Sequence, residues 1–148
     1  MSQDPSPLPD PAGRTPSTAE LVDALLTTMN RMRAHFSAAA ATVGVTPTQA
    51  KALRELAEPL TLKDLAARLG ADVSNTSSTV DRLEAKGLIR KEAHQSDRRA
   101  RMLTLTEDGT RVRHALQKSA FDTVPVLDRL DPAQRRELYA LLRLTATP

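Results

Sequence analysis

Residues 61–106 combine two helix patterns and two strand patterns in an order that few folds accommodate. A short apolar stripe over residues 62–69 is followed by Gly70, which permits a tight turn, and by a second helix pattern from Asp72 to about Lys86. Two strand-like runs follow, at residues 88–91 and 102–105. Because a helix-turn-helix places one helix in the DNA major groove, we interpret this stretch as the centre of a DNA-binding fold.

The second helix of this stretch has two chemically different faces. Val73, Val80 and Leu83 share one face, where Thr76 also fits, and we expect these side chains to be buried. A helix that merely faced water would carry Glu and Lys on its other face, since Ser, Thr and Asn are mediocre helix formers. Short polar side chains instead allow close approach to base edges and phosphates. The predicted DNA contacts of this helix are Ser74, Asn75, Ser77, Ser78 and Arg82.

The segment between the two strand patterns is strongly basic. From Lys86 to Arg101 the chain carries six lysine or arginine residues and two acidic ones, while the whole chain has a net charge of +3. Arginine side chains favour a narrow minor groove, so this hairpin is expected to reach the groove beside the helix. A hairpin whose charges merely face water is the alternative interpretation. The predicted DNA contacts of the hairpin are Asp97, Arg98, Arg99 and Arg101.

Long apolar helices are expected at both ends of the chain. Ser17 and Glu20 form a capping box, after which apolar residues recur at helical spacing up to Val43. A last helix begins at Asp131 and carries Leu138, Leu141, Leu142 and Leu144. On so small a body these helices would leave apolar surface exposed in a monomer, which favours a homodimer formed by the two ends. Packing within one subunit is the alternative.

The chain is expected to be a single, mainly α domain with a small β-hairpin wing. It has 148 residues, of which 40% are hydrophobic and only 2% aromatic, a balance that favours helices. Residues 1–16 hold five of the ten prolines and are expected to be a disordered tail. The domain would span residues 17–148, with a DNA-binding lobe at about 46–106 and dimerisation helices at about 17–44 and 106–146.

Several classes of protein are disfavoured by what the sequence lacks. There is no cysteine, so disulfides and thiolate zinc sites are excluded, and the three histidines are too scattered to predict a metal site. No nucleophile elbow or glycine-rich phosphate loop is present, so neither enzymatic activity nor a cofactor is expected. Without a signal peptide or a run of about 18 apolar residues, we expect a soluble cytoplasmic protein.

Four groups of residues together resemble the MarR family of bacterial transcription regulators. They are Asp81-Arg82-Leu83-Glu84, then Gly87-Leu88-Ile89, the wing pattern Asp97-x-Arg99 before Leu105-Thr106, and Leu69-Gly70 eleven residues before Asp81. The resemblance implies a winged-helix homodimer whose two recognition helices enter successive major grooves. It also implies that Arg99 reaches into the minor groove while Asp97 holds its guanidinium. Where many relatives carry an arginine in the recognition helix, this chain has Thr76-Ser77-Ser78-Thr79, which suggests different base contacts.

The sequence therefore predicts a sequence-specific, DNA-binding transcriptional regulator that acts on a pseudo-palindromic double-stranded operator. The resemblance further implies a repressor that a small aromatic ligand releases from DNA. Candidates to line the ligand cleft are Met29, Met32, Phe36 and Phe121, each of which plain core packing also explains. The alternative function is a winged-helix protein-interaction module, which would have a wing of mixed charge and an apolar recognition face.

Overall fold

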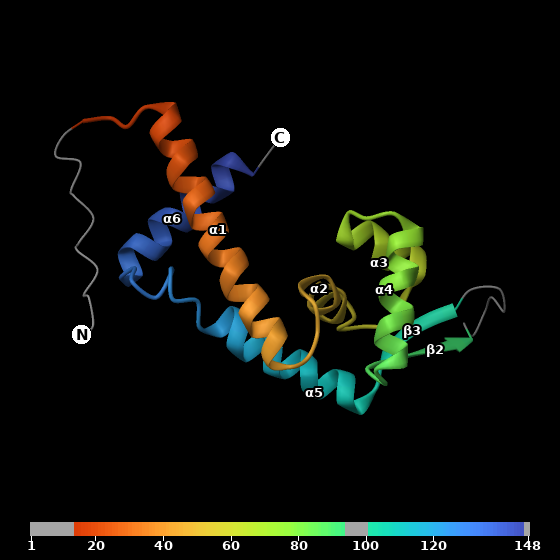
Figure 1. Ribbon diagram of the computed structural model, residues 1–148. Coiled ribbons are helices and arrows are strands. Elements are labelled where there is room, and N and C mark those ends of the chain that lie inside the picture. The colour runs from red at the N-terminus through yellow and green to blue at the C-terminus, as the bar shows by residue number, and fades with distance from the viewer. Residues whose placement is uncertain (1–13, 94–100, 147–148) are drawn as a thin grey trace.

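The structure is a computed structural model that describes residues 14–93 and 101–146. Their elements are α1 (Thr18–Thr42), α2 (Pro47–Glu55), β1 (Leu60–Thr61), α3 (Leu62–Leu69), α4 (Val73–Ala85), β2 (Ile89–Ala93), β3 (Arg101–Leu105), α5 (Glu107–Leu116), the π-helical segment η1 (Gln117–Asp122) and α6 (Pro132–Thr145). Figure 1 shows α6 and the first half of α1 at one end, and α3, α4, β2 and β3 at the other. The expected mainly α fold with a small wing is confirmed.

Helix α1 begins at the predicted capping box. Ser17 Oγ accepts a hydrogen bond from the Glu20 amide at 3.3 Å, and the Ser17 amide donates to Glu20 Oε2 at 2.8 Å. Only the C-terminal end of this helix, at Ala39 and Ala40, is fully buried. The apolar residues of its first three turns are about half exposed; they are Leu21, Val22, Leu25, Leu26 and Met29. The long helix thus packs against the rest of the chain at its C-terminal end and is exposed at its N-terminal end.

The hydrophobic core lies in the half of the molecule that contains α2, α3, α4 and the sheet. Its most deeply buried side chains come from all of these elements and include Leu53, Leu65, Val80, Leu83, Ile89 and Leu103. Close-packed aliphatic side chains of this kind hold the surrounding elements in one arrangement. The core therefore fixes the position of α4 relative to the wing.

The wing is part of a three-stranded antiparallel sheet with the order β1-β3-β2. Ile89 pairs with Leu105 at the base of the hairpin, and Ala93 pairs with Arg101 at its outer end. Strand β1 was not anticipated, because two residues are too few to show a periodic pattern. Its Leu60 pairs with Leu103, which closes the sheet over the core.

A close backbone contact joins α5 to the base of the wing. Thr106 caps α5 by accepting from the Gly109 amide at 3.0 Å, and its hydroxyl donates to the Gly87 carbonyl at 2.6 Å. A Cβ atom on Gly109 would lie 1.9 Å from the Leu88 carbonyl oxygen, so only glycine fits here. The helix continues as η1 and ends before Pro125.

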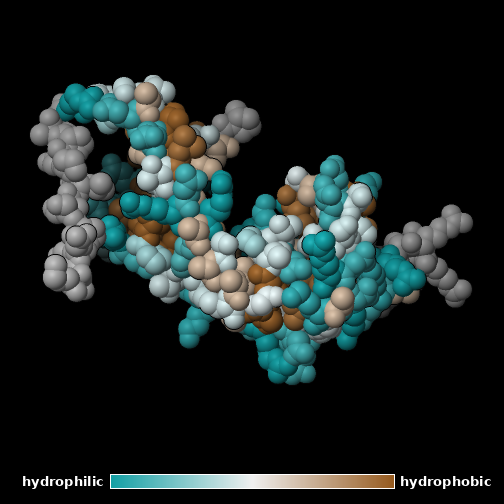
Figure 2. Space-filling view, viewed as in Figure 1, coloured by the Kyte–Doolittle hydropathy of each residue, from teal (hydrophilic) through white to brown (hydrophobic). Residues whose placement is uncertain are grey.

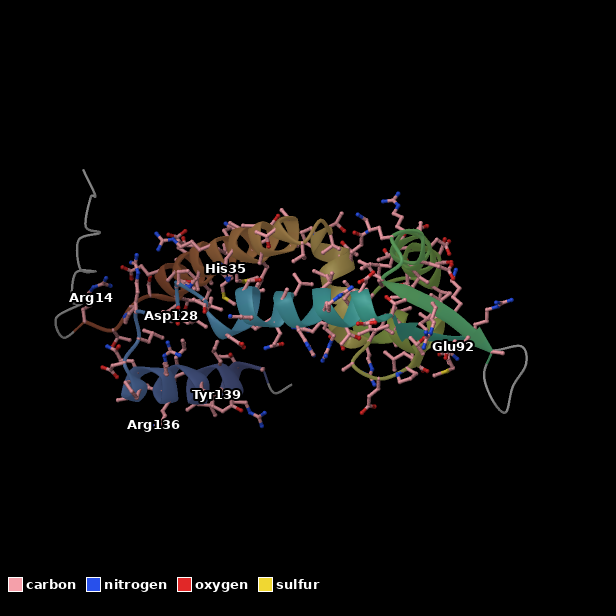
Figure 3. All side chains as sticks on the ribbon, turned by 90° about the horizontal axis from the view of Figure 1, so that it is seen from below. Arg14, His35, Glu92, Asp128, Arg136 and Tyr139 are labelled. Carbon is pink, nitrogen blue, oxygen red and sulfur yellow. The ribbon has the colours of Figure 1, made fainter. Side chains whose placement is uncertain are left out.

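Helix α6 packs least of all against the rest of the chain. It begins at a capping box in which Asp131 Oδ1 accepts from the Ala133 and Gln134 amides, and none of its residues is buried. In Figure 1 it passes behind α1, but the view turned by 90° in Figure 3 separates the two helices. Among the described residues, no helix is both long and apolar enough to cross a membrane.

Candidate nucleic-acid interface

The turn between α3 and α4 depends on Gly70. This residue ends α3 in the left-handed region, with φ of 61°, and its amide donates to the Ala67 carbonyl at 3.1 Å. Such a conformation carries little strain only for glycine. Leu65 of α3 and Val80 and Leu83 of α4 are all buried in the common core. The two helices are therefore held as a rigid helix-turn-helix, and α4 occupies the position of a recognition helix.

The two faces of α4 divide largely as the sequence predicts. Thr76, Val80 and Leu83 are at most 2% exposed. Of the predicted DNA contacts, Ser77 is half-buried, and the exposed ones are Ser74, Asn75, Ser78 and Arg82. The Ser78 hydroxyl makes only a long 3.4 Å hydrogen bond to the Ser74 carbonyl. The face is thus a set of small polar groups that remain accessible to a partner.

The start of α4 corrects one sequence prediction. Val73 was expected on the buried face, but it is 49% exposed. As the first residue of the helix it precedes Thr76, where contact with the core begins, so no neighbouring element covers it. Asp72 also differs from a typical capping residue, because its carboxylate accepts from Asn75 Nδ2 at 3.3 Å rather than from a backbone amide.

An ion-pair cluster joins the base of the wing to α4. The Lys91 ammonium lies 2.7 Å from Asp81 Oδ1 and 2.8 Å from Glu84 Oε2. These hydrogen bonds raise the pKa of Lys91 above its usual value, with Asp81 contributing most. Sequence reasoning missed this role of Lys91, because the register of β2 against α4 is visible only in the folded chain. The cluster holds the hairpin and the recognition helix in a defined relative position.

The outer part of the wing lies partly outside the described residues. Asp97, Arg98 and Arg99 belong to the segment 94–100 and are not described. Arg101, the fourth predicted contact of the wing, is exposed at the start of β3. The roles of Asp97, Arg98 and Arg99 therefore remain predictions, while β2 and β3 carry the hairpin outward beside α4 (Figure 1).

A cavity of about 710 Å³ lies between α1, α2, α4 and the α5–η1 segment. Its lining includes all four residues that the sequence nominated for a ligand cleft, Met29, Met32, Phe36 and Phe121. The rings of Phe36 and Phe121 have centroids 5.2 Å apart, and the Arg54 guanidinium carbon lies 5.2 Å from the Phe121 ring centroid. The structure thus brings these side chains, which are distant in sequence, around one space.

Among the described residues, the charged groups that line this cavity are all basic, and no aspartate or glutamate lines it. The Nε atom of the half-buried Arg113 is shielded from solvent and has no hydrogen-bond partner in this part of the chain. Sequence reasoning missed the four basic side chains because they come from three different helices; they are Arg33, Lys51, Arg54 and Arg113. Asn75, Thr76 and Thr79 of α4 complete part of the wall, so the cavity reaches the recognition helix.

Across the described ranges, no three His, Asp or Glu side chains form a group that could hold a metal ion. His35 and His114 lie on different helices, and His94 falls in the segment that is not described.

Comparison with curated proteins and family models identifies relatives of the helix-turn-helix region. Residues 45–100 match the model of the MarR family. An uncharacterized HTH-type transcriptional regulator of Bacillus subtilis, YfiV, is 33% identical over 81 residues. That alignment covers 54% of this chain and 51% of YfiV, so the chain spans about half the length of this relative.

Solved structures resemble the chain over most of its length. RV1404 from Mycobacterium tuberculosis is 29% identical with a TM-score of 0.75, over 91% of this chain and 96% of that one. Sco3205, a MarR family transcriptional regulator from Streptomyces coelicolor solved in complex with DNA, is 26% identical with a TM-score of 0.72, over 93% and 91%. Residues 45–100 are therefore a MarR-family domain, and the protein has the winged helix-turn-helix fold of that family.

Proposed function

We propose that this protein is a sequence-specific DNA-binding transcription regulator that represses its target genes. The observation that carries the proposal is the exposed face of α4, where short polar side chains stand beside a basic hairpin on a rigid core. The DNA complex of Sco3205 and the description of YfiV as a regulator support it. A protein-interaction module would instead present an apolar face, and Val73 is the one large apolar side chain that α4 exposes.

The functional unit is a homodimer held by the two ends of the chain. We call the exposed apolar side chains of these ends the terminal apolar surface; they are Leu21, Val22, Leu25, Leu26 and Met29 of α1, and Tyr139, Leu141, Leu142 and Leu144 of α6. Figure 2 shows apolar surface along the outer part of α1. Clustered exposed apolar side chains of this kind support an interaction site. A second copy covers it in the proposed dimer.

Dimerisation sets the form of the operator. A two-fold axis relates the two α4 helices, so the operator is pseudo-palindromic. For both helices to enter one face of the duplex, they must lie about 34 Å apart, which is one helical turn. A ligand that changes this separation prevents both helices from binding at once.

The 710 Å³ cavity is the proposed site of such a ligand. Two phenylalanine rings suit an aromatic molecule. Among the described residues, the charged groups of the lining are all basic and Arg113 Nε has no partner, which suits a carboxylate. The cavity touches both α1 and α4. Lys86 also joins these regions, because its ammonium donates to the Gly44 carbonyl at 2.8 Å. Occupation of the cavity would therefore shift α4 relative to the dimer helices.

A fluorescence-anisotropy titration tests the DNA part of this proposal. The probe is the DNA immediately upstream of the protein's own gene, with random DNA of equal length as competitor at two salt concentrations. We expect binding that survives the competitor and weakens only partly as salt rises. Binding that random DNA abolishes would reduce the interaction to phosphate attraction. That result would contradict a sequence-specific regulator.

The same assay tests the ligand part. Benzoate is the probe, with benzamide as an uncharged control of the same shape. We expect benzoate, but not benzamide, to release the protein from DNA, and Arg113→Met to abolish the release while leaving DNA binding intact. Equal effects of the two compounds would show that the basic lining does not select a carboxylate.

A further inference from the structure

Val73 is the first residue of α4 and the one large apolar side chain that this helix leaves uncovered. It is 49% exposed, whereas the other large apolar residues, Val80 and Leu83, are 1% and 0% exposed. Helix stability does not explain why a valine stands at this position, because a β-branched residue is a poor helix former. The neighbouring Asp72 makes no side-chain capping hydrogen bond either, so the start of α4 is not built for stability.

Val73 lies at the N-terminal end of α4, at the boundary between its buried face and the face that is proposed to contact DNA. At 100° per residue, it is about 20° around the helix from the buried Val80, about 40° from the half-buried Ser77 and about 100° from the exposed Ser74. Residues four apart are neighbours on one side of a helix, so Val73 and Ser77 lie one above the other. The N-terminal residues of a recognition helix are those that contact base edges.

The chemistry of Val73 differs from that of the rest of this face. Ser74, Asn75, Ser78 and Arg82 all end in hydrogen-bonding groups, whereas the isopropyl group of valine has none. In the major groove, the apolar group that base pairs present is the C5-methyl of thymine. Contact with that methyl removes apolar surface of both partners from water.

We propose that Val73 is a specificity-determining residue that recognises one thymine in each half of the operator through its C5-methyl group. The inference rests on the proposed function, because it requires α4 to lie in the major groove. It goes beyond that function by assigning a base and an atom to one side chain. Val73 then determines preference at one base pair, while the polar residues of α4 act at others.

The test removes the methyl group alone. The probe is a duplex that the full-length protein enriches from a random-sequence library, with each thymine replaced in turn by uracil. We expect one uracil position per half-site to weaken binding of the unmodified protein about four-fold. This equals about 0.8 kcal/mol for a methyl-sized group, at 1.4 kcal/mol per tenfold.

The variant Val73→Ala connects this effect to the side chain. We expect it to bind the thymine and uracil duplexes equally, because it cannot reach the methyl. Alanine is a better helix former than valine, so α4 should form in the variant, and an unchanged melting temperature would verify this. The matched control is Ser78→Ala on the same helix, which should retain the four-fold uracil effect.

Two results would overturn the assignment while leaving the proposed function intact. One is a uracil effect of equal size in the unmodified protein and Val73→Ala, which would assign the methyl to another side chain. The other is the absence of an effect at every thymine, although the enriched duplex is still preferred over a scrambled one. If no duplex is preferred over its scrambled form, the inference and the proposed function fail together.

Discussion

Side chains on α4 change environment within a single turn, from the exposed Val73 to Thr76 at 2% exposure. Burial of the Thr76 hydroxyl carries little cost, because it donates a hydrogen bond to the Asp72 carbonyl at 2.9 Å. Ser74, Asn75 and Ser78 lie on the other side, where water competes for their polar groups. At the residue scale, this separation of satisfied from available polar groups supports the proposed contact of α4 with bases.

A substitution of the single residue Arg99 tests what the wing contributes to DNA binding. We predict that Arg99→Ala weakens binding to the enriched duplex by about ten-fold or more, since hydrogen bonds to charged groups are worth about 1.5–3 kcal/mol. Anisotropy measures the affinity, and sedimentation checks that the dimer persists. The matched control is Arg136→Ala, an arginine on α6 far from the wing (Figure 3). Equal affinities for the unmodified protein and Arg99→Ala would remove the wing arginine from the mechanism.

Glu20 makes the start of α1 sensitive to acid. Hydrogen bonds from Arg14, and then from the Ser17 amide and hydroxyl, lower the pKa of Glu20 from 4.5 to about 2. Because the folded pKa is depressed, the stabilisation is fully present above pH 4.5 and is lost as the pH falls toward 2. We predict that protection from amide exchange, measured relative to the intrinsic rate at each pH, decreases in the first turn of α1 over that window. Glu20→Gln should abolish this pH-dependent loss of protection, and an unchanged protection profile in this variant would contradict the assignment.

At the scale of elements, the wing and α4 act as one unit because Lys91 bridges them. The pairs are largely exposed, so each contributes only about 0–1 kcal/mol to folding. Their effect is expected instead on geometry, since in the proposed DNA complex α4 and the wing fit adjacent grooves together. An element held at the wrong angle loses contacts even when both parts remain folded.

Lys91→Met tests this coupling. We predict a several-fold loss of operator affinity with only a small decrease in melting temperature, because a methionine keeps the aliphatic stem but removes the ammonium. The control is Lys118→Met, a substitution at an exposed lysine of η1. An unaltered affinity in Lys91→Met would show that the core alone positions the wing.

At the scale of the whole molecule, the first and last described helices leave large apolar side chains exposed. Helix α6 buries none of its residues, and the first half of α1 exposes its apolar side (Figures 1 and 3). The core lies at the opposite end of the molecule. In the proposed dimer, the core that folds around α2, α3, α4 and the sheet is therefore separate from the terminal apolar surface, and the proposed ligand site lies between the two.

Leu25→Glu tests the terminal apolar surface. A charge buried in an apolar interface is costly, so we predict that this variant sediments as a monomer and binds the operator at least ten-fold more weakly. The control Ala38→Glu places the same charge on an exposed position of the same helix. A dimer that survives Leu25→Glu would place the subunit contact elsewhere.

Local signals in the sequence determined the elements of this protein. The capping box at Ser17 and the predicted start at Asp131 correctly located two helix starts, and Gly70 located the turn. These signals act within a few residues and are therefore readable along the chain. The exposed faces of α4 followed from its periodicity, apart from Val73.

Tertiary structure alone decided how distant residues meet. The exposure of Val73, the pairing of β1 with β3, the Lys91 cluster and the all-basic charged lining of the cavity each depend on which elements pack together. Burial at a helix end depends on neighbours rather than on periodicity. Charges become one site only when the core sets the distances between them, and no spacing along the chain contains that information.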